Sequence, residues 1–128
     1  KIGRSSSSKR LVLDGCIHAR EWKNAQILTK QAEDILRDYP DFKKRFTNTC
    51  VYILPMVNPD GVNLVTGAVK ENSDVYLNFK SLANNYPQIP FPSGWKANFN
   101  GVDLKNFQHI NIGATRSYIF LLKFLQFW

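Results

Sequence analysis

The stretch LVLDGCIHAREW, residues 11–22, decides the fold of this chain. It opens with apolar residues and reaches Asp14-Gly15, a pattern typical of a buried strand that ends in a turn. Beyond the stretch, charged residues alternate with apolar ones at the spacing of a helix. The apolar residues are Ala25, Leu28, Ala32, Ile35 and Leu36. We therefore expect a strand that passes directly into an amphipathic helix beginning near Glu21.

A second strand is predicted after this helix. The helix should end near residues 38–39, because Pro40 disfavours helical geometry in the residue before it. The run CVYIL, residues 50–54, is almost entirely apolar, as expected for a strand covered on both faces. Strand, helix and strand in this order form a right-handed unit whose two strands are parallel. The sequence thus predicts an α/β fold with a mostly parallel sheet flanked by helices.

The two cysteines, Cys16 and Cys50, fall at opposite ends of these neighbouring strands. About five residues at ~3.3 Å each separate them, which is beyond the reach of a disulfide. We expect two free thiols.

The remaining segments have weaker patterns. Residues 1–9 contain four consecutive serines and are expected to be a flexible lead-in. NPDG, residues 58–61, predicts a tight turn, and the prolines within residues 62–92 predict a long loop region. Residues 95–104 are expected to be ordered, with a turn at Asn100-Gly101.

His18 and Glu21 are the strongest chemical signal in the chain. Ligands of open α/β sheets bind beyond the carboxyl ends of the strands, where both residues are expected to lie. An imidazole and a carboxylate across such a turn can bind one zinc ion, which as a catalytic site also needs a third protein ligand. Spacing alone leaves alternatives open. His18 could be a hydrogen-bonded loop histidine, and Glu21 an acid favoured by the helix dipole.

Three segments, in the same order, resemble the carboxypeptidase A-like zinc metallopeptidases. DGCIHAREW, residues 14–22, is similar to the zinc-binding segment of that family. VYILPMVNPDG, residues 51–61, is similar to its next parallel strand and NPDG turn. GWK at residues 94–96 and GVDL at residues 101–104 resemble the stretch that leads into its substrate-carboxylate motif. The resemblance implies that the chain is the N-terminal part of a zinc carboxypeptidase domain.

The resemblance also implies roles for individual residues. His18 and Glu21 would bind zinc, and Arg20 between them would help to hold substrate. A surface cation paired with a helix acid is the alternative for Arg20. Lys96 matches the basic residue that polarises the scissile carbonyl in the family, although a lysine lacks the guanidinium fork.

The chain departs from the family pattern near its end. Leu104 is followed by Lys105-Asn106-Phe107, so Lys105 stands where an arginine would grip a substrate carboxylate. The third zinc ligand and the catalytic glutamate of the family would lie beyond this point, and His109 comes too early to be that ligand. We expect residues 1–107 to form the carboxypeptidase-like part and residues 108–128 to be a divergent apolar tail outside the core. A frameshifted or truncated gene would give this pattern.

The formal net charge is +7, and the basic excess lies mostly in the N-terminal third. No aromatic and basic RNA-binding motif accompanies it, so we expect no nucleic-acid partner. The most apolar run, residues 119–128, is too short to span a bilayer and contains Lys123, so we expect no membrane partner. No signal peptide is recognisable, and we expect a soluble protein that is either cytoplasmic or secreted.

We interpret the chain as part of a zinc-dependent peptidase that hydrolyses a peptide bond, impaired because its ligand set is incomplete. Peptides are the expected substrates, and the wording WKAN, residues 95–98, leans toward bacterial enzymes that cleave γ-glutamyl-diamino acid links of cell-wall peptides. The alternative is a degenerate domain without enzymatic activity, which binds an anionic polymer through its basic face.

Overall fold

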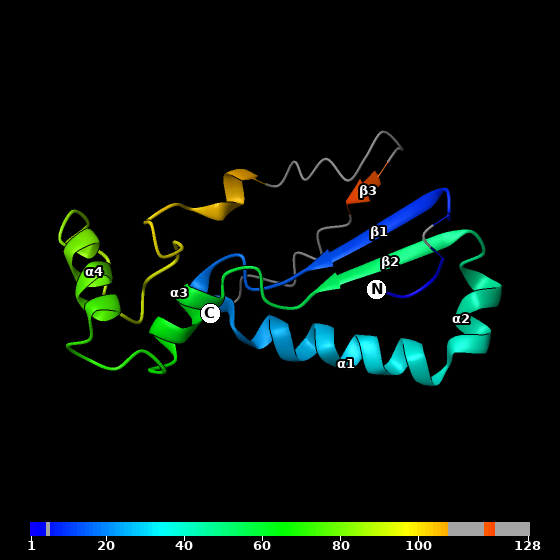
Figure 1. Ribbon diagram of the computed structural model, residues 1–128, viewed down its shortest axis with the longest axis horizontal. Helices are drawn as coiled ribbons and strands as arrows, with labels where there is room; N and C mark the ends of the chain where they lie inside the picture. Colours follow the sequence, from blue (N-terminus) through cyan, green and yellow to red (C-terminus); the bar gives the residue numbers. More distant parts are fainter. Residues whose placement is uncertain (5, 108–116, 120–128) are drawn as a thin grey trace.

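A computed structural model describes residues 1–4, 6–107 and 117–119 of the chain. A parallel sheet lies at one end of the molecule, with two helices beside it, and two further helices lie at the other end (Figure 1). The elements are β1 (Lys9–Asp14), η1 (Ala19–Glu21), α1 (Lys23–Arg37), α2 (Tyr39–Arg45), β2 (Thr49–Leu54), α3 (Pro59–Val65), α4 (Asp74–Ala83), η2 (Leu104–Phe107) and β3 (Ser117–Ile119).

The predicted α/β fold with a parallel sheet is confirmed. β1 lies in the middle of the sheet order β2-β1-β3, and both of its pairings are parallel. Leu11 is opposite Val51 in the β1–β2 register. α1 connects these strands and runs along the sheet (Figure 1). β3 falls inside the segment predicted to be a divergent tail. The rest of that segment lies outside the described residues, so the predicted boundary at residue 107 stays a prediction.

The helix after β1 ends where Pro40 predicts, but a second helix follows at once. α1 ends at Arg37, and Asp38 is both its C-terminal cap and the N-terminal cap of α2. Pro40 occupies the first turn of α2, where its missing N–H and fixed φ are tolerated. The proline therefore separates two helices rather than a helix and a loop.

A first apolar cluster packs between the sheet and α1. Its buried members are Ile2, Leu13, Leu28 and Val51. Ile2 corrects the expectation of a flexible lead-in, because it exchanges two backbone hydrogen bonds with Val51, at 2.8 and 2.7 Å. The Ile2 side chain is 6% exposed, so it adds buried apolar area to the core. The serines that follow it hide this role in the sequence.

The segment predicted as a tight turn followed by a long loop contains two helices. NPDG begins α3, because the Asn58 side chain caps the helix by accepting a hydrogen bond from the Gly61 N–H. Ser73 caps α4 in the same way through the Tyr76 N–H. The loop expectation was wrong because the cap signals at Asn58 and Ser73 were not recognised. The predicted turn at Asn100-Gly101 is confirmed: Gly101 has φ +76° and donates to the Asn98 carbonyl.

A second apolar cluster joins these helices to the segment after them. Its buried members are Ala19, Leu64, Phe79 and Trp95. The ring of Phe79 meets Trp95 edge to face, with centroids 5.8 Å apart, and meets Phe99 in the same way at 5.4 Å. This aromatic packing orders residues 84–103, which contain little regular structure. None of the helices in the described ranges is long and apolar enough to cross a membrane.

Candidate metal centre

The turn between β1 and α1 places His18 and Glu21 beyond the carboxyl end of β1, as predicted. η1 forms this turn, and the Glu21 N–H donates to the His18 carbonyl at 3.1 Å. Ala19, which is fully buried, fixes the turn in the second apolar cluster. Residues 15–16 and 57–58 continue the parallel pairing past the strand ends, through hydrogen bonds of 3.0 Å from Val57 and 3.1 Å from Asn58.

His18 lies between two carboxylates. Its Nδ1 is 2.9 Å from Glu21 Oε1, and its Nε2 is 3.3 Å from Asp103 Oδ1. The imidazole is 14% exposed, whereas Glu21 and Asp103 are 34% and 47% exposed. A ring held on both sides and mostly removed from water has one orientation, with Nδ1 toward Glu21.

This arrangement fits a cation between His18 and Glu21. A neutral imidazole donates one hydrogen bond, yet both ring nitrogens of His18 face carboxylate oxygens. Nδ1 forms a hydrogen bond of 2.9 Å with Glu21 Oε1, in which it donates when it carries the ring proton. A metal ion bound by both groups would take the place of that proton. One nitrogen and one oxygen donor are ligand types that zinc accepts.

Asp103 is a residue that the sequence reasoning missed. It lies in GVDL, which contributed to the family resemblance, but no role was assigned to it. A metal-binding histidine commonly donates its other ring N–H to a carboxylate, which fixes the ring and increases its basicity. The sequence signal was therefore present, but the distance of 85 positions between Asp103 and His18 concealed it.

Of the predicted substrate-binding residues, Arg20 lies in this turn and the backbone of Lys96 contacts it, whereas Lys105 is linked to Asp103. The Lys96 carbonyl accepts a hydrogen bond from the Ala19 N–H at 3.1 Å. The Lys105 N–H donates to Asp103 Oδ1 at 2.9 Å. Arg20 lies in η1 and is exposed. Within the described ranges no ion pair of Arg20 with an acid is present, and both interpretations of this residue stay predictions.

Cys16 is next to the candidate site but is a poor ligand. It is fully buried, and its Sγ lies 3.5 Å from the Glu21 carbonyl oxygen. Burial raises the pKa of the Cys16 thiol, and the nearby Glu21 charge raises it further. Only a thiolate binds metal well. Cys16 and Cys50 are both free and buried, as the sequence predicts.

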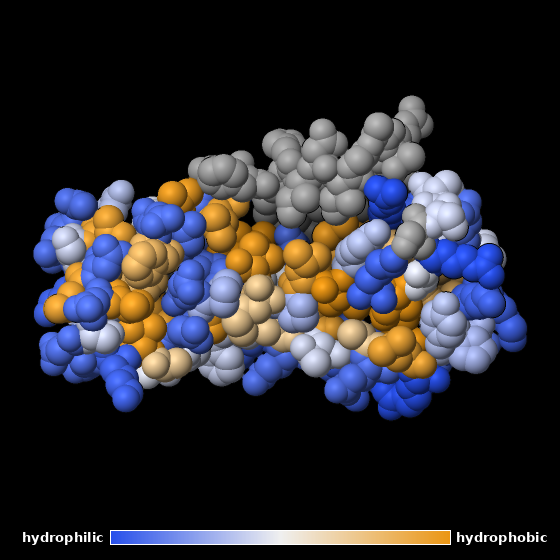
Figure 2. Space-filling model, in the orientation of Figure 1, coloured by the Kyte–Doolittle hydropathy of each residue, from blue (hydrophilic) through white to orange (hydrophobic). Residues whose placement is uncertain are grey.

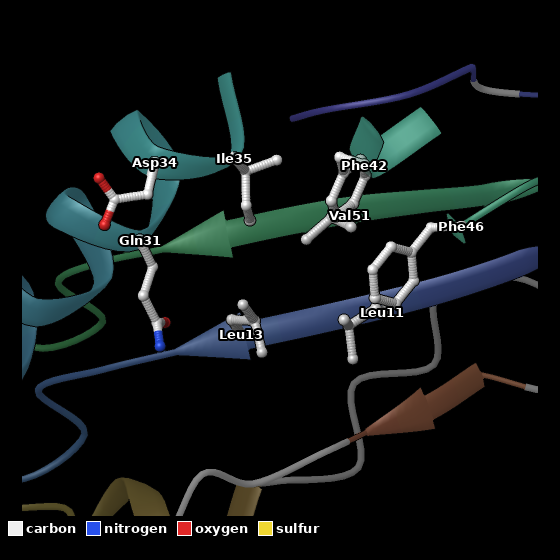
Figure 3. Close-up of a pocket in the computed structure, with 8 residues that line it drawn as sticks. All are labelled: Leu11, Leu13, Gln31, Asp34, Ile35, Phe42, Phe46 and Val51. Atoms are coloured by element: carbon white, nitrogen blue, oxygen red, sulfur yellow. The ribbon is translucent and has the colours of Figure 1, made fainter. Parts of the chain in front are cut away.

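A separate hollow of about 470 Å³ lies on the sheet face beneath α1 and α2 (Figure 3). It contains none of the predicted site residues. Its lining is Leu11, Leu13, Gln31, Asp34, Ile35, Phe42, Phe46 and Val51. Most of these are apolar residues that pack in or against the first cluster, so the hollow is a loosely filled part of that core rather than a second polar site.

Residues 1–118 match the family described as zinc carboxypeptidase. The chain belongs to the zinc carboxypeptidase family. The match extends beyond residue 107, where the similarity recognised by motif ends. No solved structure is significantly similar to the chain.

Two curated relatives show the range of the family. The chain is 36% identical over 109 residues to gamma-D-glutamyl-L-diamino acid endopeptidase 1 of Lysinibacillus sphaericus, an alignment that covers 79% of this chain and 27% of that protein. It is 31% identical over 62 residues to carboxypeptidase B of Astacus astacus, covering 48% of this chain and 20% of that protein. The chain therefore spans about a quarter of the length of these relatives.

Membership of this family implies zinc. Across residues 1–4, 6–107 and 117–119, no group of three His, Cys, Asp or Glu side chains is arranged to hold a metal ion. His18 and Glu21 are two donors, and Asp103 contacts the far ring nitrogen of His18 rather than the space beside Glu21. His109 lies outside the described residues.

Proposed function

We propose that this chain carries the zinc-binding turn of a peptidase, with His18 and Glu21 as two of the zinc ligands. The observation that supports this most is the position of His18 between Glu21 and Asp103. Glu21 can share a cation with His18 Nδ1. Asp103, on the other side of the ring, can receive the proton of Nε2. When bound, zinc polarises a peptide carbonyl and makes water more acidic, which is the chemistry of peptide-bond hydrolysis.

Three basic residues are assigned to the substrate. Arg20 is exposed beside the two ligands and is proposed to hold the peptide. Lys96 is proposed to stabilise negative charge that develops on the scissile carbonyl oxygen. Lys105 is proposed to hold a substrate carboxylate, as a point charge rather than as a bidentate fork. The backbone hydrogen bonds of both lysines to the turn and to Asp103 support this grouping.

Cell-wall peptides with γ-glutamyl-diamino acid links are the proposed substrates. The similarity to the Lysinibacillus sphaericus endopeptidase, which extends over most of this chain, supports this choice. Lys105 stands where an arginine is expected, so the chain would hold a substrate carboxylate without the bidentate geometry of a typical carboxypeptidase.

The chain of 128 residues by itself is proposed to bind zinc weakly and to hydrolyse peptides poorly or not at all. Two protein ligands do not create the closed geometry that gives metal sites their affinity. Proton transfer also requires a general base at the site. Glu21 cannot serve as that base while it binds the metal.

Calorimetric titration of the metal-free chain with zinc tests this proposal. His18→Ala and Glu21→Gln should each weaken binding by about tenfold or more, because each removes half of the donor set. His109→Ala, which changes the other histidine, is the matched control and should leave binding unchanged. Zinc binding that survives His18→Ala would place the metal elsewhere and overturn the ligand assignment.

A peptidase assay completes the test. Any residual cleavage of a peptide with a γ-glutamyl-diamino acid link should require zinc, and a chelator should abolish it. The alternative, binding of an anionic polymer, has weaker support because several basic residues are ion-paired along their helices. These pairs are Lys30 with Glu33 and Asp34, Arg37 with Asp34, and Lys44 with Asp41.

A further inference from the structure

Asn58 is the one polar residue that is buried within the described part of the chain, where it is 2% exposed. Its side-chain amide group Nδ2 donates to three backbone carbonyls: those of Ile17 at 3.3 Å, Lys96 at 3.2 Å and Ala97 at 3.0 Å. Its Oδ1 accepts from the Gly61 N–H at 3.1 Å. One side chain therefore connects the residue before His18, the segment of Lys96 and the start of α3.

We propose that Asn58 is a positioning residue for the candidate metal centre, an inference that rests on the function proposed above. Asn58 holds the turn that carries His18 and Glu21 at a fixed distance from the segment that carries Lys96 and Asp103. Without it, the two segments are joined near the site by the hydrogen bond from the Ala19 N–H to the Lys96 carbonyl. The contact between His18 and Asp103 depends on that distance.

The chemistry of this position requires an amide. Three carbonyl oxygens converge on Asn58, so the side chain must offer N–H groups toward them while its other end accepts from the helix. Aspartate would present oxygen to all three carbonyls, and serine would cap the helix without reaching them. Leaving such buried carbonyls without a donor is unfavourable, so the two segments would separate to admit water.

Gly61 supports the same junction by close approach. A Cβ atom at this position would lie 2.7 Å from the Ala19 Cβ, 2.7 Å from the Ala97 carbonyl oxygen and 2.8 Å from Asn58 Nδ2. The start of α3 is thus pressed against both segments that Asn58 connects. α3 is the element through which the metal-binding turn and the Lys96 segment are held together.

Two variants separate this positioning role from simple helix capping. Asn58→Ser keeps an acceptor for the Gly61 N–H but loses the donors to Ile17, Lys96 and Ala97. Asn58→Ala removes both functions. If capping were the role of Asn58, Asn58→Ser would behave as the parent chain does. If Asn58 positions the site, both variants should lose the contact of 3.3 Å between His18 Nε2 and Asp103 Oδ1.

The imidazole ¹⁵N resonances of His18 in the metal-free chain provide the deciding measurement. The chain has two histidines, so His18→Ala identifies the signals. In Asn58→Ser and Asn58→Ala, the Nε2 resonance should move to the position that Asp103→Asn gives, and Asp103→Asn should cause no further shift in either background. Val51→Ala, a core change remote from the site, is the control and should lower stability without moving the resonance.

Zinc affinity provides the second readout. Asp103→Asn should weaken zinc binding about 10–100-fold in the parent chain, but by no more than about twofold in the Asn58→Ser background. Additive effects, or an unmoved His18 resonance in a folded Asn58→Ser chain, would overturn the positioning role. Absence of zinc binding in the parent chain would instead sink the proposed function, and the resonances would still decide the role of Asn58.

Discussion

The two ends of this molecule are built on different principles. At one end, β1, α1 and β2 bury aliphatic side chains that recur with the period of a strand or a helix, as Leu13, Leu28 and Val51 do. At the other end, α3, α4 and an irregular segment pack around Phe79 and Trp95, which come from parts of the chain with no common period. The first arrangement therefore follows from periodic patterns in the sequence, whereas the second follows from individual aromatic contacts that no period announces.

The candidate site lies where these two ends meet. His18 follows β1, which belongs to the first cluster, while the neighbouring Ala19 is buried in the second. Asp103 and Lys96 reach the site from the segment that the aromatic cluster orders. The turn that carries His18 and Glu21 can thus be predicted from local sequence, but the residues that meet it there cannot. On the face shown in Figure 2, hydrophobic residues lie across the middle of the molecule and hydrophilic residues lie around its edges.

The largest expected effect comes from removing the ring at the centre of the second cluster. Phe79→Ala should lower the free energy of unfolding by about 3–5 kcal/mol, because Phe79 is fully buried and contacts two other rings. Denaturant unfolding measures the loss. Hydrogen exchange should show faster exchange in α4 than in β2, and equal acceleration in both would mean that the two clusters form one cooperative unit.

A methyl group at Gly61 tests the contact between the two ends. Gly61→Ala should cost about 1–3 kcal/mol, because the added Cβ meets backbone and buried side chains at less than 3.0 Å. It should also weaken zinc binding, since the turn of Ala19 must shift. Gly67→Ala is the control. Gly67 has φ +79° and open space around it, so that change should cost about 1 kcal/mol without altering zinc binding.

Asp103→Asn tests whether the distant segment contributes to the metal site. The amide keeps the size of the side chain but removes the charge beside His18 Nε2, so zinc affinity should fall about 10–100-fold. Calorimetric titration measures the change, and thermal unfolding should be nearly unchanged because Asp103 is half exposed. Asp60→Asn, an exposed acid in the first turn of α3, is the matched control. Equal effects of the two changes would indicate only a general charge effect.

The sequence predicted the first end well and the second end poorly, for a physical reason. The strands near Leu13 and Val51 and the helix between them follow from periodicity, and so does the position of His18 beyond a strand. In α4, Tyr76, Phe79, Leu82 and Ala83 recur at helical spacing and pack in or against the second cluster. This helix was missed because neither that stripe nor the cap at Ser73 was recognised. Likewise, Asn58 and Gly61 were predicted to form only a turn. The three carbonyls that Asn58 binds and the atoms that crowd Gly61 belong to other parts of the chain, so local sequence does not reveal them.

The smallest expected effect concerns Asp14, the last residue of β1, in the part of the molecule that the sequence predicted well. Burial raises the pKa of the Asp14 carboxyl above its ordinary value. Between the ordinary and the raised pKa, the folded chain holds a proton that the unfolded chain has released, so stability falls as pH rises through that window. Asp14→Asn should therefore stabilise the chain by a few tenths of a kcal/mol at neutral pH, about the size of an ordinary surface effect. The gain should disappear below the ordinary carboxyl pKa, where Asp14 is protonated in both states. Thermal unfolding at neutral and acidic pH measures this difference. A variant less stable than the parent at neutral pH would show that the ionised carboxylate, not its burial, determines what this residue contributes to the end of the strand.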